Sequence, residues 1–242
     1  MITKSIPNLF TIGNLFLGII SIMLAFDQEY NLAALMVIIA MLLDGLDGRV
    51  ARALNAQSEF GKELDSLSDV ISFGVAPAFI MYVTALTDVN PAVAWIVTAI
   101  FPICGALRLA RFNVIEGTPG YFIGLPIPAA GGVICTLALF HNDISTTFLL
   151  IAMLLVSYLM VSTVRYPNFK KIGIPKKAIW ITPFVIAAAV GLALWKPEQM
   201  PVLIFVPLVL YALLGLKKNV RMLMRRRRKS QVDSEETVSK HL

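Results

Sequence analysis

The sequence predicts an all-α integral membrane protein, a bundle of about eight transmembrane helices with both termini in the cytoplasm. The bundle is indicated by a hydrophobic content of 57% over 242 residues and by a mean hydropathy of +0.77. Apolar runs also recur at lengths close to the roughly 20 residues that cross a bilayer. The orientation is indicated by the charge of the loops.

The apolar runs divide the chain into one membrane domain, residues 1–217, and a tail, residues 218–242. The predicted spans are 8–26, 31–52, 65–87, 91–112, 122–140, 146–166, 178–195 and 200–217. Several contain proline, which membrane helices tolerate where neighbouring helices satisfy the freed carbonyls. The tail begins with basic residues and continues with polar ones, so we expect it to be disordered.

Loop charge separates the two sides of the predicted bundle. All Lys and Arg residues except Lys196 fall on one side. The opposite loops carry the acidic residues Asp27, Glu29, Asp88, Asp143 and Glu198. Basic loops remain in the cytoplasm, so we expect a multi-pass protein of the cell membrane with both termini inside. The net charge of +6 then reflects orientation and not a nucleic-acid partner.

Four aspartates dominate the polar content of the second and third spans. Asp44 and Asp47 are three residues apart and Asp65 and Asp69 four apart, so each pair shares a helix face. Four carboxylates in one small volume repel one another unless cations are bound. Oxygen ligands favour Mg²⁺ or Mn²⁺ over Zn²⁺. The sequence therefore predicts a metal site.

The depth of this site favours a function that acts on lipid headgroups. If the second helix begins near Asn31, Asp44 lies about 20 Å along its axis. In a hydrocarbon core about 30 Å thick, that position is the cytoplasmic third. An ion pathway would place carboxylates nearer the midplane. A divalent-cation transporter is nevertheless the alternative from a different functional class.

The aspartates belong to a longer pattern, D-x₂-D-G-x₂-A-R-x₈-G-x₃-D-x₃-D. It is met without a gap by Asp44, Asp47, Gly48, Ala51, Arg52, Gly61, Asp65 and Asp69. This pattern resembles the signature of the CDP-alcohol phosphotransferases. The flanking stretches are most similar to the phosphatidylserine synthases within that family: PNLFTIGN at 7–14, LDSLSDVISFGVAPA at 64–78, RLARFNV at 108–114 and GLPIPAAGG at 124–132.

The resemblance implies an enzyme that transfers a phosphatidyl group from CDP-diacylglycerol to the hydroxyl of L-serine and releases CMP. It implies two divalent metals per site, with Asp44 and Asp65 as ligands of both. Asp47 would complete the first metal site and Asp69 the second, and Asp69 would also act as the general base. The resemblance further suggests a homodimer.

The resemblance also implies residues that contact the CDP moiety: Gly48, Arg52, Ser58, Asn8 and Thr11, with Asn14 added because it shares a helix face with the last two. From the residues alone, the polar side chains of the first helix could equally join helices together. Arg52 could equally be an anchor at the membrane interface.

The acceptor is expected to meet Arg108 and Arg111, which share a face at the cytoplasmic end of the fourth span. A guanidinium suits the carboxylate of serine. The positive-inside rule alone would also place arginines there. Within the same family, glycerol 3-phosphate or inositol is the alternative acceptor, with these arginines and Lys170 and Lys171 as possible phosphate ligands.

Overall fold

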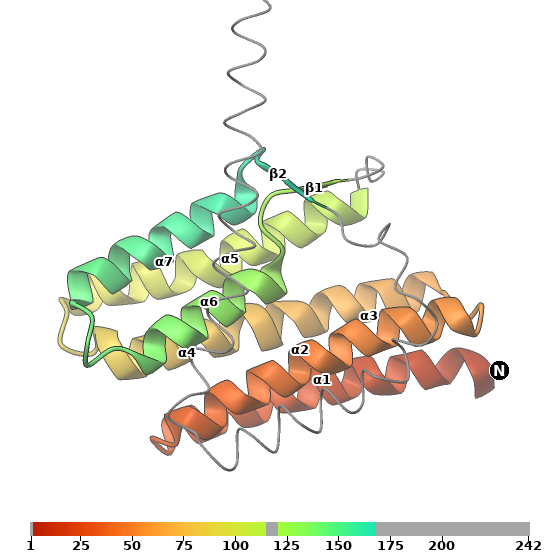
Figure 1. The fold of residues 1–242 in the computed structure, drawn as a ribbon, viewed down its shortest axis with the longest axis horizontal. Coiled ribbons are helices and arrows are strands. Elements are labelled where there is room, and N and C mark those ends of the chain that lie inside the picture. The colour runs from red at the N-terminus through yellow and green to blue at the C-terminus, as the bar shows by residue number, and fades with distance from the viewer. Residues whose placement is uncertain (1, 115–120, 168–242) are drawn as a thin grey trace, which may run out of the picture.

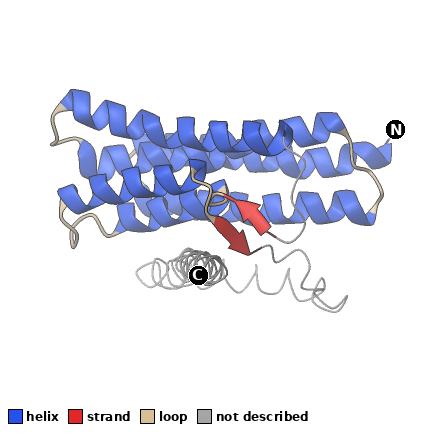
Figure 2. Ribbon diagram, turned by 90° about the horizontal axis from the view of Figure 1, so that it is seen from above, coloured by secondary structure: helices blue, strands red, loops and turns tan. Residues whose placement is uncertain are grey.

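The computed structural model describes residues 2–114 and 121–167, which form an elongated helical bundle (Figure 1). Its α-helices are α1 (Ile2–Phe26), α2 (Tyr30–Ala53), α3 (Glu59–Asp69), α4 (Ala76–Met81), α5 (Pro91–Val114), α6 (Ile127–Leu139) and α7 (Thr146–Val161). Two π-helical segments, η1 (Val70–Val75) and η2 (Tyr82–Leu86), lie before and after α4. A two-stranded antiparallel ribbon pairs β1 (Tyr121–Ile123) with β2 (Arg165–Pro167), as Figure 2 shows.

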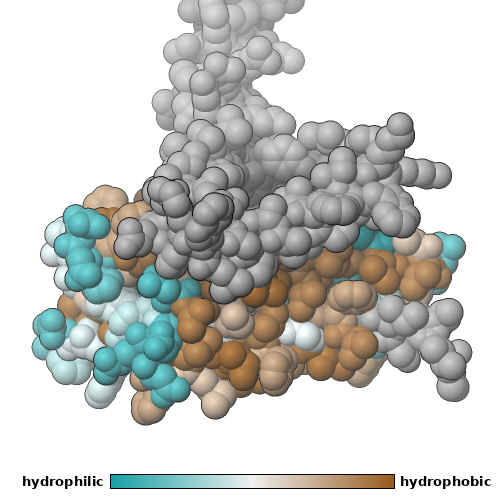
Figure 3. All heavy atoms as spheres, turned by 60° about the horizontal axis from the view of Figure 1, so that its bottom comes forward, coloured by the Kyte–Doolittle hydropathy of each residue, from teal (hydrophilic) through white to brown (hydrophobic). Residues whose placement is uncertain are grey.

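Among the described residues, four helical stretches are long and apolar enough to cross a membrane: 7–26, 30–53, 59–86 and 91–114. They confirm the first four predicted spans, with the third continued through α3, η1, α4 and η2. Apolar residues cover the middle of the face seen in Figure 3, and hydrophilic residues gather toward one end of it. The predicted spans 178–195 and 200–217, and the tail, lie outside the described residues.

The fifth and sixth predicted spans are shorter than expected. Helix α6 has 13 residues and α7 has 16, whereas the sequence predicted helices over 122–140 and 146–166. The strands of the ribbon take the place of helix at the start of the predicted span 122–140 and at the end of the predicted span 146–166. Gly124 has a φ of +78°, outside the helical region, and Pro126 precedes the first turn of α6. The predicted helical fold is confirmed for the described residues, to which this short two-stranded ribbon is added.

The core of the described bundle lies around α6. Nearly all of this helix is buried, and it packs against α2, α4, η1 and α7. The fully buried side chains Phe73, Phe101, Ile134 and Met153 come from four different segments and meet there. By contrast, α1 exposes large apolar side chains at spacings of three and four, namely Leu9, Ile12, Phe16, Ile19, Met23 and Phe26. That pattern is typical of a helix facing lipid.

Two serines fix α1 against the third span. Ser68 donates a hydrogen bond to the carbonyl oxygen of Thr11 at 3.2 Å, and Ser72 donates to that of Asn14 at 2.9 Å. One turn further, a Cβ added to Gly18 would lie 2.8 Å from the Cα of Ser72. The absence of a side chain at Gly18 therefore permits the close approach of these two helices.

Candidate active site

The turn between α2 and α3 places the aspartates. Asn55, just after the end of α2, has a φ of 50°, and the amides of Asn55 and Ala56 donate to the carbonyls of Arg52 and Ala51. This is the hydrogen-bond pattern of a Schellman motif, in which Asn is a common left-handed residue. Ser58 then caps α3 by accepting a hydrogen bond of 3.0 Å from the amide of Gly61. Both helices pack on α1.

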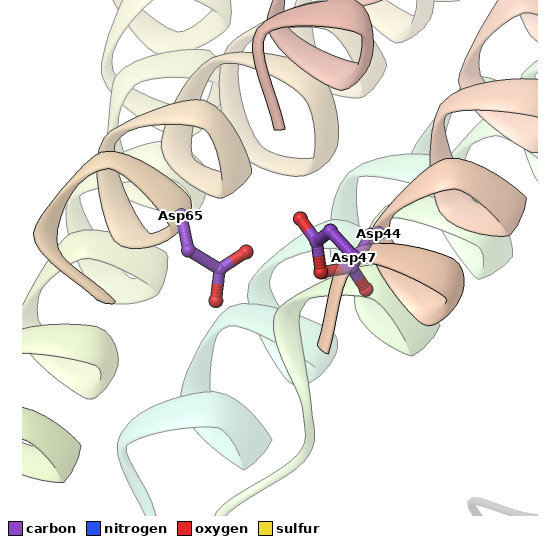
Figure 4. Close-up of side chains that lie close together, drawn as sticks. All are labelled: Asp44, Asp47 and Asp65. Atoms are coloured by element: carbon purple, nitrogen blue, oxygen red, sulfur yellow. The ribbon is translucent and has the colours of Figure 1, made fainter. Parts of the chain in front are cut away.

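Three of the four predicted metal ligands come together. Asp44 and Asp47 extend from α2 toward Asp65 of α3, as Figure 4 shows. One carboxylate oxygen from each lies within 4.8 Å of the others. Asp47 is 5% exposed, and the other two are partly buried. Carboxylate oxygens converging at such a distance are a suitable donor set for a hard divalent cation, so the residues present fit Mg²⁺ or Mn²⁺.

The fourth aspartate, Asp69, lies one turn beyond Asp65 and outside that closest group. Its side chain is 7% exposed, and its Oδ1 has no hydrogen-bond partner among the described residues. It interacts electrostatically with Asp44 and Asp65, which repel it, and with Arg108, which attracts it. A buried carboxylate oxygen of this kind can accept a proton or a metal ion.

A cavity of about 370 Å³ opens beside the carboxylates, at the end of the bundle where α2 turns into α3. Its lining includes Asp47 and Asp65 together with five of the predicted nucleotide contacts: Asn8, Thr11, Gly48, Arg52 and Ser58. The guanidinium of Arg52 lies over Gly48, where an added Cβ would be 3.4 Å from Nη1. The volume is in the range of small-molecule sites.

The polar residues of α1 differ in what they contact. Thr11 donates a hydrogen bond of 2.8 Å to Oδ2 of Asp47. Asn8 lines the cavity and approaches α3, since a Cβ at Gly61 would lie 2.9 Å from its Oδ1. Asn14 is fully buried, does not line the cavity, and has no hydrogen-bond partner for its amide among the described residues. Its nucleotide contact stays a prediction.

The two arginines of α5 have separate surroundings. Arg108 is 7% exposed, and its guanidinium carbon lies 6.0 Å from the centre of the Phe112 ring. Arg111 donates instead to backbone carbonyls at the end of α7 and in β1. Arg108 interacts electrostatically with Asp69, whereas the Nη groups of Arg111 are directed to the end of α7.

Some residues of the cavity were not anticipated from the sequence. Gln57, Glu59 and Lys62 line it beside Ser58. Asn113 also lies close by, donating a hydrogen bond of 3.0 Å to Ser66 and accepting one of 3.3 Å from Lys62. The turn residues could have been found from their position between the two aspartate pairs. Asn113 is distant in sequence, and no local signal pointed to it.

Comparison with known proteins identifies the family. The CDP-alcohol phosphatidyltransferase family matches residues 4–161, which hold the four aspartates and the cavity. The chain belongs to this family. It is thus an enzyme, and the alternative of a cation transporter is set aside.

Curated relatives agree with this assignment. A CDP-diacylglycerol–serine O-phosphatidyltransferase from Helicobacter pylori is 45% identical over 174 residues, which cover 69% of this chain and 73% of the relative. A protein of the same name from Bacillus subtilis is 40% identical over 166 residues, covering 69% and 92%. The archaetidylserine synthase of Methanothermobacter thermautotrophicus is 42% identical over 173 residues, covering 70% and 72%.

Proposed function

We propose that this enzyme transfers the phosphatidyl group of CDP-diacylglycerol to the hydroxyl of L-serine, giving phosphatidylserine and CMP. The observation that carries the proposal is the convergence of Asp44, Asp47 and Asp65 beside a cavity of the size of a nucleotide site. The chain is also similar to enzymes whose names give serine as the acceptor. The names of these relatives specify serine, which also favours serine over glycerol 3-phosphate or inositol as the acceptor.

Asp44, Asp47, Asp65 and Asp69 would hold two divalent cations, Mg²⁺ or Mn²⁺. When bound, such cations neutralise the pyrophosphate and stabilise the departing CMP. Thr11 contributes by holding Asp47, because its hydrogen bond restricts the carboxylate to one orientation. The cluster as a whole needs positive charge, since repulsion among four carboxylates opposes their approach.

The cavity would receive the CDP group. Gly48 and Gly61 line this cavity without side chains of their own, and Arg52, which also lines it, can donate to a phosphate oxygen. Asn8 and Ser58 supply further polar contacts. Asn14, which is buried and does not line the cavity, is proposed as a further contact of the same substrate.

Asp69 would act as the general base. A serine hydroxyl is a weak nucleophile at neutral pH, so a positioned carboxylate must accept its proton as the oxygen attacks. The new bond joins the serine oxygen to the lipid-linked phosphorus. The bond from that phosphorus to the CMP oxygen breaks, and its electron pair leaves with CMP. The proton passes to Asp69, so no covalent enzyme intermediate is needed.

Arg108 is proposed to bind the carboxylate of serine. It lies close enough to Asp69 for their charges to interact, and a bidentate guanidinium–carboxylate pair is a strong, oriented contact. A charged hydrogen bond of this kind contributes up to about 3 kcal/mol, or roughly a hundredfold in affinity. Arg111 was expected to share this role, but its contacts with backbone carbonyls support a different one.

The remaining proposals concern the membrane orientation and the oligomeric state of the enzyme. Loop charge supports a multi-pass protein of the cell membrane whose active site faces the cytoplasm, and a homodimer is proposed from the family resemblance. Cysteine-labelling of the loop at Asp88 from outside intact cells tests the orientation. Crosslinking in native membranes tests the dimer.

The decisive experiment measures CMP release by the purified full-length chain. CDP-diacylglycerol is supplied with serine, glycerol 3-phosphate or inositol in separate reactions containing Mg²⁺ or Mn²⁺. We expect rapid release with serine alone and identify the lipid product by mass spectrometry. Release with either other acceptor, and none with serine, would overturn the assignment of serine.

A further inference from the structure

Arg111 joins the cytoplasmic end of α5 to the end of α7. Its Nη1 donates a hydrogen bond of 2.8 Å to the carbonyl oxygen of Val161. Its Nη2 lies 3.3–3.4 Å from three further carbonyl oxygens, those of Met160, Ser162 and Ile123. Both Nη groups are therefore engaged by backbone acceptors, which leaves Arg111 poorly placed to bind a substrate carboxylate.

These carbonyls need such a partner. The last four carbonyls of a helix receive no hydrogen bond from an amide of the same helix, and together they carry partial negative charge. In α7 the carbonyls of Tyr158 and Leu159 accept from the amides of Ser162 and Leu125. Those of Met160 and Val161 accept from Arg111. The guanidinium thus completes the C-terminal cap of α7 from another helix.

Arg108 is held one turn away on the same helix. Because an α-helix rises about 5.4 Å per turn and is rigid over that length, anchoring Arg111 also determines the depth and rotation of Arg108. A second contact ties α5 to the metal-binding helix α3, where Asn113 bonds with Lys62 and Ser66 on either side of Asp65. The end of α5 is therefore fixed on two sides.

We propose that Arg111 is a positioning residue for the acceptor site: by anchoring α5 to α7 and β1, it holds Arg108 beside Asp69. This inference rests on the acceptor role given to Arg108 under the proposed function. It predicts that Arg111 affects serine binding only through Arg108. Arg111 neither touches the acceptor nor takes part in the chemistry.

The test is a double-mutant cycle on the full-length enzyme in membranes, with KM for serine, KM for CDP-diacylglycerol and kcat measured separately. Arg108→Gln and Arg111→Gln are each expected to raise the serine KM, by about tenfold for Arg111, the size expected from one lost charged hydrogen bond. Neither should change the KM for CDP-diacylglycerol. The double variant should be no worse than Arg108→Gln alone, because Arg111 then has nothing left to position.

Three further variants separate positioning from general destabilisation. Gly124→Ala leaves both arginines intact but inserts a methyl group that overlaps the Met160 carbonyl at the same junction, where φ is also +78°. It should reproduce the rise in serine KM. Trp95→Phe removes the hydrogen bond to Tyr82 at the opposite end of α5 and should leave the serine KM unchanged. Arg111→Lys, which retains a cation at α7 without the fork, should restore part of the affinity.

The outcomes distinguish this inference from the function on which it rests. A normal serine KM in Arg108→Gln would overturn the acceptor role of Arg108. If that variant is impaired but Arg111→Gln is not, or if the two losses multiply, Arg111 does not act through Arg108. An equal rise in both KM values with a lower melting temperature would reduce Arg111 to a purely structural cap.

Discussion

The hydroxyl of Thr11 in α1 donates a 2.8 Å hydrogen bond to Oδ2 of Asp47 in α2. Two helices are thereby joined at a carboxylate of the metal cluster. A hydrogen bond to a metal ligand selects which oxygen faces the metal and lowers the cost of holding it there. We therefore propose that Thr11, which was expected to contact the nucleotide, orients a carboxylate of the proposed metal site.

Thr11→Val should weaken metal binding while preserving the shape of the side chain. We expect the Mg²⁺ or Mn²⁺ concentration for half-maximal activity to rise about tenfold, with the maximal rate approached at high metal concentration. Thr11→Ser keeps the hydroxyl and serves as the control. An unchanged metal titration in the valine variant would show that the hydrogen bond does not orient Asp47.

Asp44→Asn and Asp65→Asn should abolish CMP release, because each removes one charged oxygen ligand from the converging group. Chelation of the wild-type enzyme with EDTA should have the same effect, and added Mg²⁺ or Mn²⁺ should reverse it. Full activity in a preparation shown to be metal-free by elemental analysis would contradict the metal site.

Asp69→Asn should separate binding from chemistry. The amide has similar volume but cannot accept the proton of the serine hydroxyl, so turnover should fall by at least about a hundredfold. Binding of CDP-diacylglycerol, measured by displacement of a fluorescent analogue, should persist through the three converging aspartates. A loss of binding as large as the loss of rate would make Asp69 only a metal ligand.

Gly18→Ala should destabilise the enzyme without altering the cavity. An added Cβ would meet the backbone of Ser72, so α1 and η1 would have to separate, at a cost of about 1–3 kcal/mol. Gly45→Ala is the matched control, because no atom lies within 4 Å of the position of its Cβ. Thermal unfolding in detergent should show a lower Tm for the first variant only.

The convergence of the aspartates could be predicted from sequence because these residues are close together along the chain. Helical periodicity places Asp44 beside Asp47 and Asp65 beside Asp69, and a short turn joins the pairs. The first four helices were confirmed for a similar reason, since length and hydropathy suffice to identify a long apolar helix. Both inferences depend on local pattern.

Contacts between segments that are distant in the sequence could not be predicted from local pattern. The positive-inside rule explains why Arg108 and Arg111 lie at one end of α5, but it does not distinguish a buried guanidinium from one that caps α7. Whether an arginine is buried or caps α7 depends on where α7 ends, because Arg111 bonds to the carbonyls of residues 160–162. The ribbon was missed because its first strand, Tyr121–Ile123, is apolar and continues the hydrophobic run that leads into α6.

The capped end of α7 also bears on how two unlike substrates reach each other. A helix of 16 residues is about 24 Å long, shorter than a hydrocarbon core of about 30 Å. Exposed carbonyls at the end of a helix are costly in lipid, but here the guanidinium of Arg111 and the amide of Leu125 donate to them. We propose that the bundle stops below the membrane surface at this end, so that serine, which is water-soluble, can reach the CDP group of a lipid whose acyl chains stay in the bilayer.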